Sequence, residues 1–205
     1  MKTIYLIRHA QSSPSHVDHI KFWPLSPLGK KQAEQLSRLL INFNLTQLYS
    51  SPYIRCINTI LPFSNFSGLK IIERDGLREH MILTTIQDGF ERVWKKTWTD
   101  FNYRPPGGET AYECQQRIIK ELYNIANESP HNSSVGVCTH GNIIGLFMSS
   151  LKTSFSYAET ISLRNPEIIA LTYKNETFAH DVNFSCPDLE IICSPFEETP
   201  FHTSE

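Results

Sequence analysis

The 205-residue sequence has no long run of basic residues, no long apolar run and no pair of cysteines in CxxC spacing. Its 19 Lys and Arg are balanced by 21 Asp and Glu, which gives a formal net charge of -2. Nucleic acids and anionic membrane surfaces select clustered cations, so neither is a predicted partner. No segment reaches the roughly 18 apolar residues of a membrane span. The five cysteines, an odd number, favour free thiols in a reduced, cytoplasmic protein.

What is present is the composition of an ordinary globular protein, with 40% hydrophobic and 20% charged residues. A chain of this length suits one domain, and no repeat or linker divides it. We therefore expect a single domain over residues 1–205. Within it we expect a cap-like insertion at about 80–106 and a loosely ordered, polar tail from about 195.

Short apolar segments alternate along the chain with segments of helical periodicity. We expect strands at residues 3–7, 45–49, 69–72, 135–138, 168–173 and 176–182, and helices at about 29–42, from about 53, at 109–127 and at 142–150. Such alternation is typical of an α/β fold. The pattern predicts a three-layer sandwich with a mostly parallel central sheet and helices on both faces.

Four basic side chains follow the ends of predicted strands. Arg8 and His9 end the first strand, Arg55 follows the second, and His140 follows the strand at 135–138. Ligands of parallel sheets bind outside the carboxyl ends of the strands, so we expect these side chains to converge. The arginine fork matches phosphate oxygens, and a neutral histidine can act as a nucleophile. The cluster therefore predicts a phosphate monoester as ligand and covalent phosphoryl transfer as chemistry.

Sequence blocks around these residues resemble the signatures of the histidine phosphatase superfamily, also called the phosphoglycerate mutase-like family. The blocks appear in the family's order between residues 4 and about 146. They are Leu6-Ile7-Arg8-His9-Ala10-Gln11-Ser12, Leu25-Ser26-Pro27-Leu28-Gly29-Lys30-Lys31-Gln32-Ala33, Ser50-Ser51-Pro52-Tyr53-Ile54-Arg55-Cys56-Ile57-Asn58-Thr59, Leu77-Arg78-Glu79, Gly107-Gly108-Glu109-Thr110 and Thr139-His140-Gly141. Each block alone is weakly diagnostic, but their order and spacing together favour this family and its fold.

The resemblance implies a role for each matching residue. His9 would attack phosphorus, while Arg8, Arg55 and His140 would bind the phosphate oxygens and stabilise the transition state. Glu79 would protonate the leaving oxygen and later activate water. No metal ion or other cofactor is implied.

Two assignments, a further phosphate contact and the general acid, remain open. Ser15 stands where many members have Asn, and is a candidate for one further phosphate hydrogen bond. Glu73 and Glu109 are alternatives to Glu79 as the acid.

Three functions fit these residues. The first is a phosphomonoesterase acting on a small or medium-sized organic phosphate. The second is a phosphoglycerate mutase, and the third is a non-catalytic module that binds phosphorylated ligands. The R-H-Y-G run of the glycolytic mutases is missing after Glu79, and the stretch from there to Gly107 is short, which favours hydrolysis.

Some residues that could suggest chemistry have simpler interpretations. Phe90, Trp94 and Trp98 recur every four residues, which favours the core of the cap-like segment over a substrate platform. The His16-x-Asp18-His19 segment contains metal-binding residue types, but in a loop we interpret it as incidental. Cys138 lies in an apolar strand, so we expect a buried, unreactive thiol.

Overall fold

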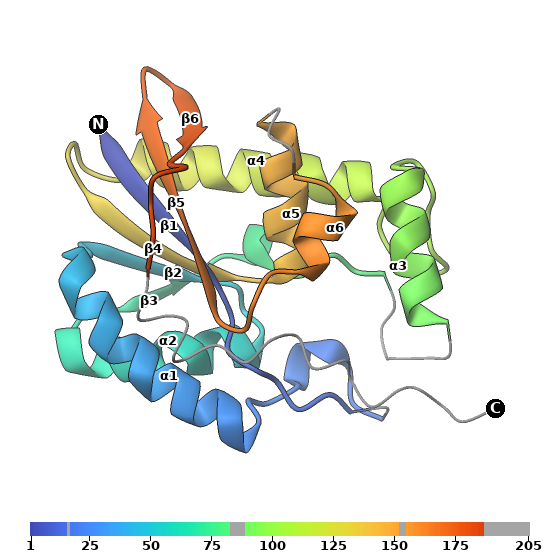
Figure 1. The fold of residues 1–205 in the computed structure, drawn as a ribbon, viewed down its shortest axis with the longest axis horizontal. Coiled ribbons are helices and arrows are strands. Elements are labelled where there is room, and N and C mark those ends of the chain that lie inside the picture. Colours follow the sequence, from blue (N-terminus) through green and yellow to red (C-terminus); the bar gives the residue numbers. More distant parts are fainter. Residues whose placement is uncertain (16, 83–88, 152–154, 187–205) are drawn as a thin grey trace.

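The computed structural model describes residues 1–15, 17–82, 89–151 and 155–186. The strands of this part of the chain form one sheet in the order β3-β2-β4-β1-β5-β6 (Figure 1). Their bounds are β1 Lys2–Arg8, β2 Gln47–Ser50, β3 Ile71–Glu73, β4 Ser134–Thr139, β5 Glu167–Lys174 and β6 Thr177–His180. All six predicted strands are therefore present, with shifted ends.

The sheet is parallel across four strands and antiparallel at one side. β1 pairs in parallel with β4, β4 with β2, and β2 with β3. β5 runs antiparallel to β1, and β6 antiparallel to β5. The mostly parallel sheet is confirmed. The register pairs Arg8 with Thr139 and Ser50 with Cys138, so the carboxyl ends of β1, β2 and β4 lie at one edge.

Helices cover both faces of the sheet, which confirms the three-layer arrangement. α1 and α2 lie on one face, and α4 and α5 lie on the other (Figure 1). α6 follows α5, and α3 lies beside the first turns of α4. The bounds are α1 Pro27–Leu40, α2 Ile54–Ser67, α3 Phe90–Thr99, α4 Ala111–Glu128, α5 Gly141–Ser150 and α6 Tyr157–Ile161, with 3₁₀ turns η1 Ile20–Phe22, η2 Ile41–Phe43 and η3 Asp75–Leu77. None of the helices in the described ranges is long and apolar enough to cross a membrane.

The core follows from the two-residue period of the strands. Ile4 and Leu6 of β1 belong to the buried cluster shared with α4 and α5, whereas Ile7 belongs to the cluster shared with α1 and α2. Successive side chains of a strand point to opposite faces, so one central strand contributes to both layers. All three side chains have at most 1% of their surface exposed.

Helix ends explain where the boundaries differ from those expected. Ser26 Oγ accepts from the N–H of Gly29 at 2.9 Å, and Pro27 occupies the first turn, so α1 begins two residues earlier than predicted. A reciprocal capping box between Thr110 and Glu113 starts α4. Gly68, in the left-handed region at φ 76°, ends α2. The Leu69 carbonyl oxygen accepts from Ser64 Oγ of this helix, and β3 starts at 71 and not at 69.

The expected insertion at 80–106 contains α3, while residues 83–88 within it are not described. The expected tail from 195 lies outside the described residues. α6 was not predicted, because five residues are too few to show a helical period.

Candidate active site

The predicted basic cluster forms at the carboxyl edge of the sheet. Arg8 ends β1, His9 follows it, Arg55 lies in the first turn of α2, and His140 directly precedes α5. Each of the four is at most 8% exposed. Arg55 joins the two histidines: its Nε donates to His9 Nε2 at 3.1 Å, and its Nη2 lies 3.0 Å from His140 Nδ1. The His9 and His140 ring centroids are 5.3 Å apart.

Hydrogen bonds fix the tautomer of His9. Its Nδ1 lies 2.7 Å from the carbonyl oxygen of Ala10, which can only accept, so Nδ1 carries the proton. Arg55 Nε can only donate, so His9 Nε2 has the lone pair. Burial, followed by the charges of Arg55 and Arg8, holds the pKa of His9 well below 6.5. The ring is therefore neutral at pH 7, with a nucleophilic nitrogen facing Arg55.

His140 is fixed in the same manner. Arg55 Nη2 donates to Nδ1, so Nε2 carries the proton and donates to Ser51 Oγ at 2.8 Å. Burial, then the charge of Arg55, lowers the pKa of His140 well below 6.5. The positive charge of the free site thus comes from its arginines and not from its histidines.

Arg8 completes the anion site beside the start of α5. Its Nη1 donates to the carbonyl oxygen of Leu163. Burial lowers the pKa of Arg8 to about 10, so the guanidinium stays charged at neutral pH. α5 begins at Gly141, and the unpaired backbone N–H groups of a helix start favour anions. Arg8 thus lies against Gly141, the first residue of α5, and Arg55 contacts His140, which directly precedes that helix.

Glu79 lies within the field of these arginines. Its side chain is half-buried, and Oε1 accepts from the backbone N–H of His80 at 2.8 Å. Burial raises the pKa of Glu79, while Arg55, Arg8 and Arg117 act against the rise. A carboxyl with a raised pKa beside an anion site suits a general acid, so Glu79 remains the predicted acid.

A family model places this cluster among known proteins. The model of the histidine phosphatase superfamily (branch 1) matches residues 4–183. The chain belongs to this superfamily. The fold and the motif order predicted from the sequence agree with that membership.

Individual relatives carry both phosphatase and mutase names. The chain is 26% identical over 188 residues to "Probable phosphoglycerate mutase GpmB" of Proteus mirabilis, covering 85% of this chain and 86% of that one. It is 35% identical over 155 residues to "Putative phosphoserine phosphatase 2" of Hydrogenobacter thermophilus, covering 70% and 75%. A solved structure of phosphoserine phosphatase from Entamoeba histolytica, in complex with 3-phosphoglyceric acid, superposes with a TM-score of 0.75 at 19% identity, covering 92% and 100%.

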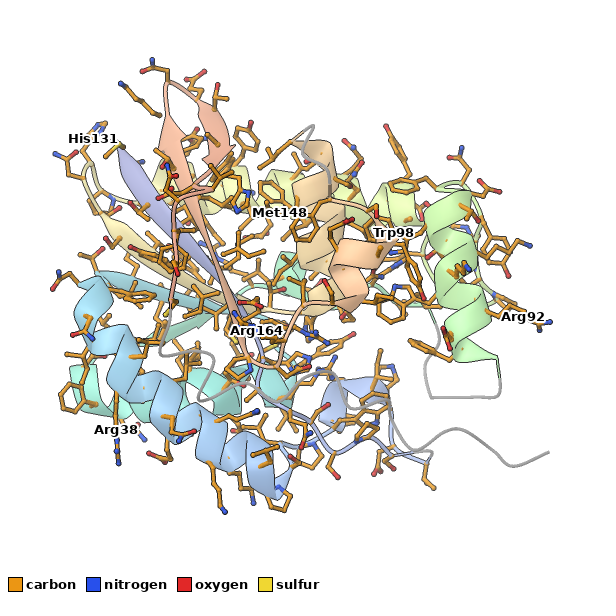
Figure 2. All side chains as sticks on the ribbon, in the orientation of Figure 1. Arg38, Arg92, Trp98, His131, Met148 and Arg164 are labelled. Atoms are coloured by element: carbon orange, nitrogen blue, oxygen red, sulfur yellow. The ribbon has the colours of Figure 1, made fainter. Side chains whose placement is uncertain are left out.

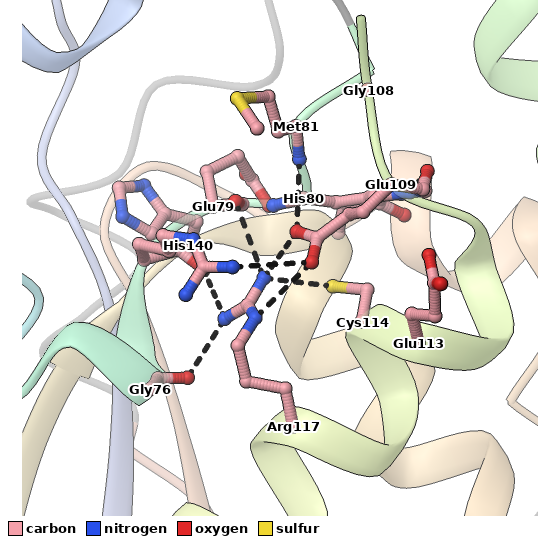
Figure 3. A network of polar contacts seen from close by, with 12 residues as sticks. Gly76, Glu79, His80, Met81, Gly108, Glu109, Glu113, Cys114, Arg117 and His140 are labelled. Atoms are coloured by element: carbon pink, nitrogen blue, oxygen red, sulfur yellow. Dashed lines mark hydrogen bonds and ion pairs between the residues drawn. The ribbon is translucent and has the colours of Figure 1, made fainter. Parts of the chain in front are cut away.

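In this histidine phosphatase, Arg117 of α4 holds the segment that carries Glu79. Arg117 Nη1 donates to the carbonyl oxygens of Gly76 and Arg78 at 2.8 and 2.9 Å. Its Nη2 pairs with the Glu109 carboxylate (Figure 3). Sequence reasoning missed Arg117, because one arginine on an amphipathic helix is normally a solvent-facing residue.

The alternatives to Glu79 suit the acid's task less well. Burial alone would raise the pKa of Glu109, but its hydrogen bond to Arg117 and the charges of Arg117 and Arg78 lower it. Glu109 is thus held as an ion-paired carboxylate. Glu73 is exposed on β3. Ser15 Oγ accepts from the N–H groups of Val17 and Asp18 at 3.2 and 3.1 Å, and both donors belong to its own loop. Its phosphate contact stays a prediction.

Two more residues support His9 from distant parts of the chain. Asn165 Nδ2 donates to the carbonyl oxygen of His9 at 2.8 Å, and Thr59 Oγ1 accepts from the N–H of Ala10 at 2.9 Å. Thr59 lies within the recognised block after Arg55, but nothing in the sequence around Asn165 indicated a role. The backbone on both sides of the nucleophile is therefore anchored.

The remaining sequence interpretations have structural outcomes. Trp94 and Trp98 contact the Tyr157 ring, with centroids 5.5 and 6.4 Å away, which places them in packing between α3 and α6. Cys138 is fully buried, and burial raises the pKa of its thiol. His16 lies outside the described residues, and His19 Nδ1 accepts from the N–H of Lys21 at 3.1 Å.

Proposed function

We propose that this chain hydrolyses small or medium-sized organic phosphate monoesters through a phosphohistidine on His9. The observation that carries the proposal is the fixed tautomer of His9. Nδ1 is bonded to the carbonyl oxygen of Ala10, and the Nε2 lone pair accepts from Arg55. Phosphate oxygens would replace Nε2 as partners of Arg55, which frees the lone pair for attack.

In the first step, His9 Nε2 forms a bond to phosphorus while the bond to the ester oxygen breaks. Arg8 and Arg55 bind the equatorial oxygens, with His140 as a further contact. Protonated Glu79 gives its proton to the leaving oxygen, so an alcohol departs. Since the arginines stabilise the developing charge, the proposal includes no metal ion.

In the second step, Glu79 is a carboxylate and takes a proton from water. The water oxygen attacks phosphorus, and the bond to His9 Nε2 breaks. Phosphate leaves, His9 regains its lone pair, and Glu79 is again protonated. Each residue thus returns to its starting state.

Phosphorylated three-carbon acids are the first substrates to test, because relatives are named for phosphoserine and phosphoglycerate. A cytoplasmic location suits such substrates and agrees with free cysteines. Nucleic acid and membrane remain outside the proposed partners, since the charge of -2 supplies no cationic excess.

The test is phosphate release from p-nitrophenyl phosphate and phosphoserine in excess chelator, with wild type, His9→Ala and His180→Ala. His180 lies on β6, away from the cluster, and controls for loss of a histidine. We expect activity in wild type and His180→Ala and none in His9→Ala. Activity that chelator abolishes would contradict the metal-free mechanism. Interconversion of phosphoglycerates with a bisphosphate activator, without net phosphate release, would indicate the mutase. Ligand binding without turnover would indicate the binding module.

A further inference from the structure

A chain of hydrogen bonds runs from α3 to the segment that carries Glu79. Trp98 Nε1 donates to Asn142 Oδ1 at 2.8 Å, and Asn142 Nδ2 lies 2.9 Å from His80 Nδ1. His80 Nε2 lies 2.9 Å from the carbonyl oxygen of Glu109. The backbone N–H of His80 donates to Glu79 Oε1 at 2.8 Å. This series of hydrogen bonds therefore begins at Trp98, in the cap-like segment, and ends at Glu79, the proposed acid.

The chemistry of its members fixes the direction of each bond. An indole N–H only donates, so Asn142 presents Oδ1 to Trp98 and Nδ2 to His80. A carbonyl oxygen only accepts, so His80 carries its proton on Nε2 and offers the Nδ1 lone pair. The hydrogen bonds at the two ring nitrogens thus require the same neutral tautomer of His80. Burial lowers the pKa of His80, which agrees with a neutral ring.

These hydrogen bonds also connect the segment after His140 with the segment after Glu79. Asn142 is the second residue of α5 and follows His140 by two positions, while His80 directly follows Glu79. Asn142 and His80 are 4% and 2% exposed, so their hydrogen bonds are shielded from water. Trp98 projects from α3 toward α5 and α6 (Figure 2).

We propose that Trp98, Asn142 and His80 are positioning residues that hold Glu79 in line with the leaving-group oxygen. The inference rests on the proposed phosphohistidine mechanism, because it assigns a support to the acid of that mechanism. Arg117 binds the segment before Glu79, at Gly76 and Arg78, and the His80 ring ties the residue after Glu79 to Glu109. A displacement of about 1 Å can cost about a hundredfold in rate, so a carboxyl acid benefits from two supports.

α3 provides a matched control for Trp98. Trp94 lies one turn earlier on the same helix and also contacts Tyr157, but its Nε1 has no hydrogen-bond partner among the described residues. Trp98→Phe and Trp94→Phe therefore remove the same atoms from neighbouring sites. Only the first breaks the chain to Asn142.

The first measurement compares two leaving groups. p-Nitrophenolate departs without a proton, whereas an alkoxide needs the acid, and kcat/KM reports the step that breaks the ester bond. For Trp98→Phe we expect kcat/KM for an alkyl phosphate to fall about tenfold and that for p-nitrophenyl phosphate to change less than about twofold. Trp94→Phe should match wild type on both. Equal losses on both substrates, or none on either, would overturn the inference.

The second measurement reads the His80 tautomer directly, from the ¹⁵N shifts of its ring nitrogens in full-length protein. We expect a protonated Nε2 and an unprotonated Nδ1 in wild type. In Asn142→Asp a carboxylate would face Nδ1, so His80 should carry protons on both nitrogens at pH 6. The other charged groups that act on His80 are Glu109 and Arg117, and both are unchanged in this variant. An aspartate suits the first turn of α5, so the variant should fold.

The two measurements separate failure of the inference from failure of the proposed function. Absence of His9-dependent activity in wild type would refute the function, and the inference with it, whatever the tautomer. With activity present, a wild-type His80 protonated on Nδ1 would refute the positioning chain and leave the phosphohistidine mechanism standing.

Discussion

The guanidinium group of Arg8 lies directly against Gly141, since a Cβ atom on residue 141 would come within 2.9 Å of Arg8 Nε. We expect Gly141→Ala to displace Arg8 and to lower kcat/KM about 10- to 100-fold. Alanine favours a helix by about 0.5–1 kcal/mol over glycine, which offsets the cost of the contact. The free energy of unfolding should therefore change by less than about 1 kcal/mol. Steady-state kinetics and urea denaturation test both parts, and wild-type kinetics in this variant would contradict the contact.

The raised pKa of Glu79 predicts a pH profile. Only the protonated carboxyl can donate to the leaving oxygen, so kcat/KM for an alkyl phosphate should fall as pH rises through the pKa of Glu79. His9 should not limit the reaction near neutrality, because its pKa is held well below 6.5. Glu79→Gln should lose about 10²- to 10⁴-fold in rate and no longer show this alkaline limb. If kcat/KM of Glu79→Gln still fell with rising pH at the same pH as in wild type, another group would be the acid.

The ion pair between Glu109 and Arg117 predicts pH-dependent stability. The pKa of Glu109 is lowered in the folded protein, so its contribution is present above the usual 4.5 and is lost as pH falls through the lowered value. We expect Glu109→Gln to reduce the free energy of unfolding by about 1–2 kcal/mol at pH 7, a value discounted for partial exposure. The difference should shrink as pH falls below 4.5. Denaturant titrations at several pH values test this, and a constant difference would argue against the ion pair.

Burial of three thiols predicts their reactivity. Cys56, Cys114 and Cys138 are 0% exposed, and burial raises the pKa of Cys114 and Cys138 well above 9.0. These thiols should react with an alkylating reagent only after unfolding, because the thiolate is the reactive form. Mass spectrometry after alkylation with and without denaturant gives the assignment. Rapid labelling of Cys138 in the native protein would contradict its place in the core.

The parts of the fold that are local in sequence were predictable. The first strand, the helix start at Ser26-Pro27 and the Arg8-His9 end of β1 each follow from a few neighbouring residues. The convergence of Arg55 and His140 on His9 was also predictable, because the carboxyl ends of parallel strands meet at one edge.

The supporting residues were not predictable, since each acts on a segment far away in the chain. Arg117 binds carbonyl oxygens about forty positions earlier, and Asn165 binds the carbonyl oxygen of His9 156 positions earlier. Their side chains resemble ordinary surface residues until the fold is known. The antiparallel direction of β5 was equally hidden, because alternation of apolar residues is the same in both directions.

The central position of β1 has a consequence for synthesis of the protein. β1 is made before its two neighbours in the sheet, β4 and β5, which end at Thr139 and Lys174. Both edges of this apolar strand therefore remain unpaired while most of the chain emerges from the ribosome, and such edges invite aggregation. The nascent chain carries the nucleophile early, yet a chain stalled before Asn165 has neither the second neighbour of β1 nor the Asn165 anchor of His9. Catalytic competence thus requires that synthesis has passed β5.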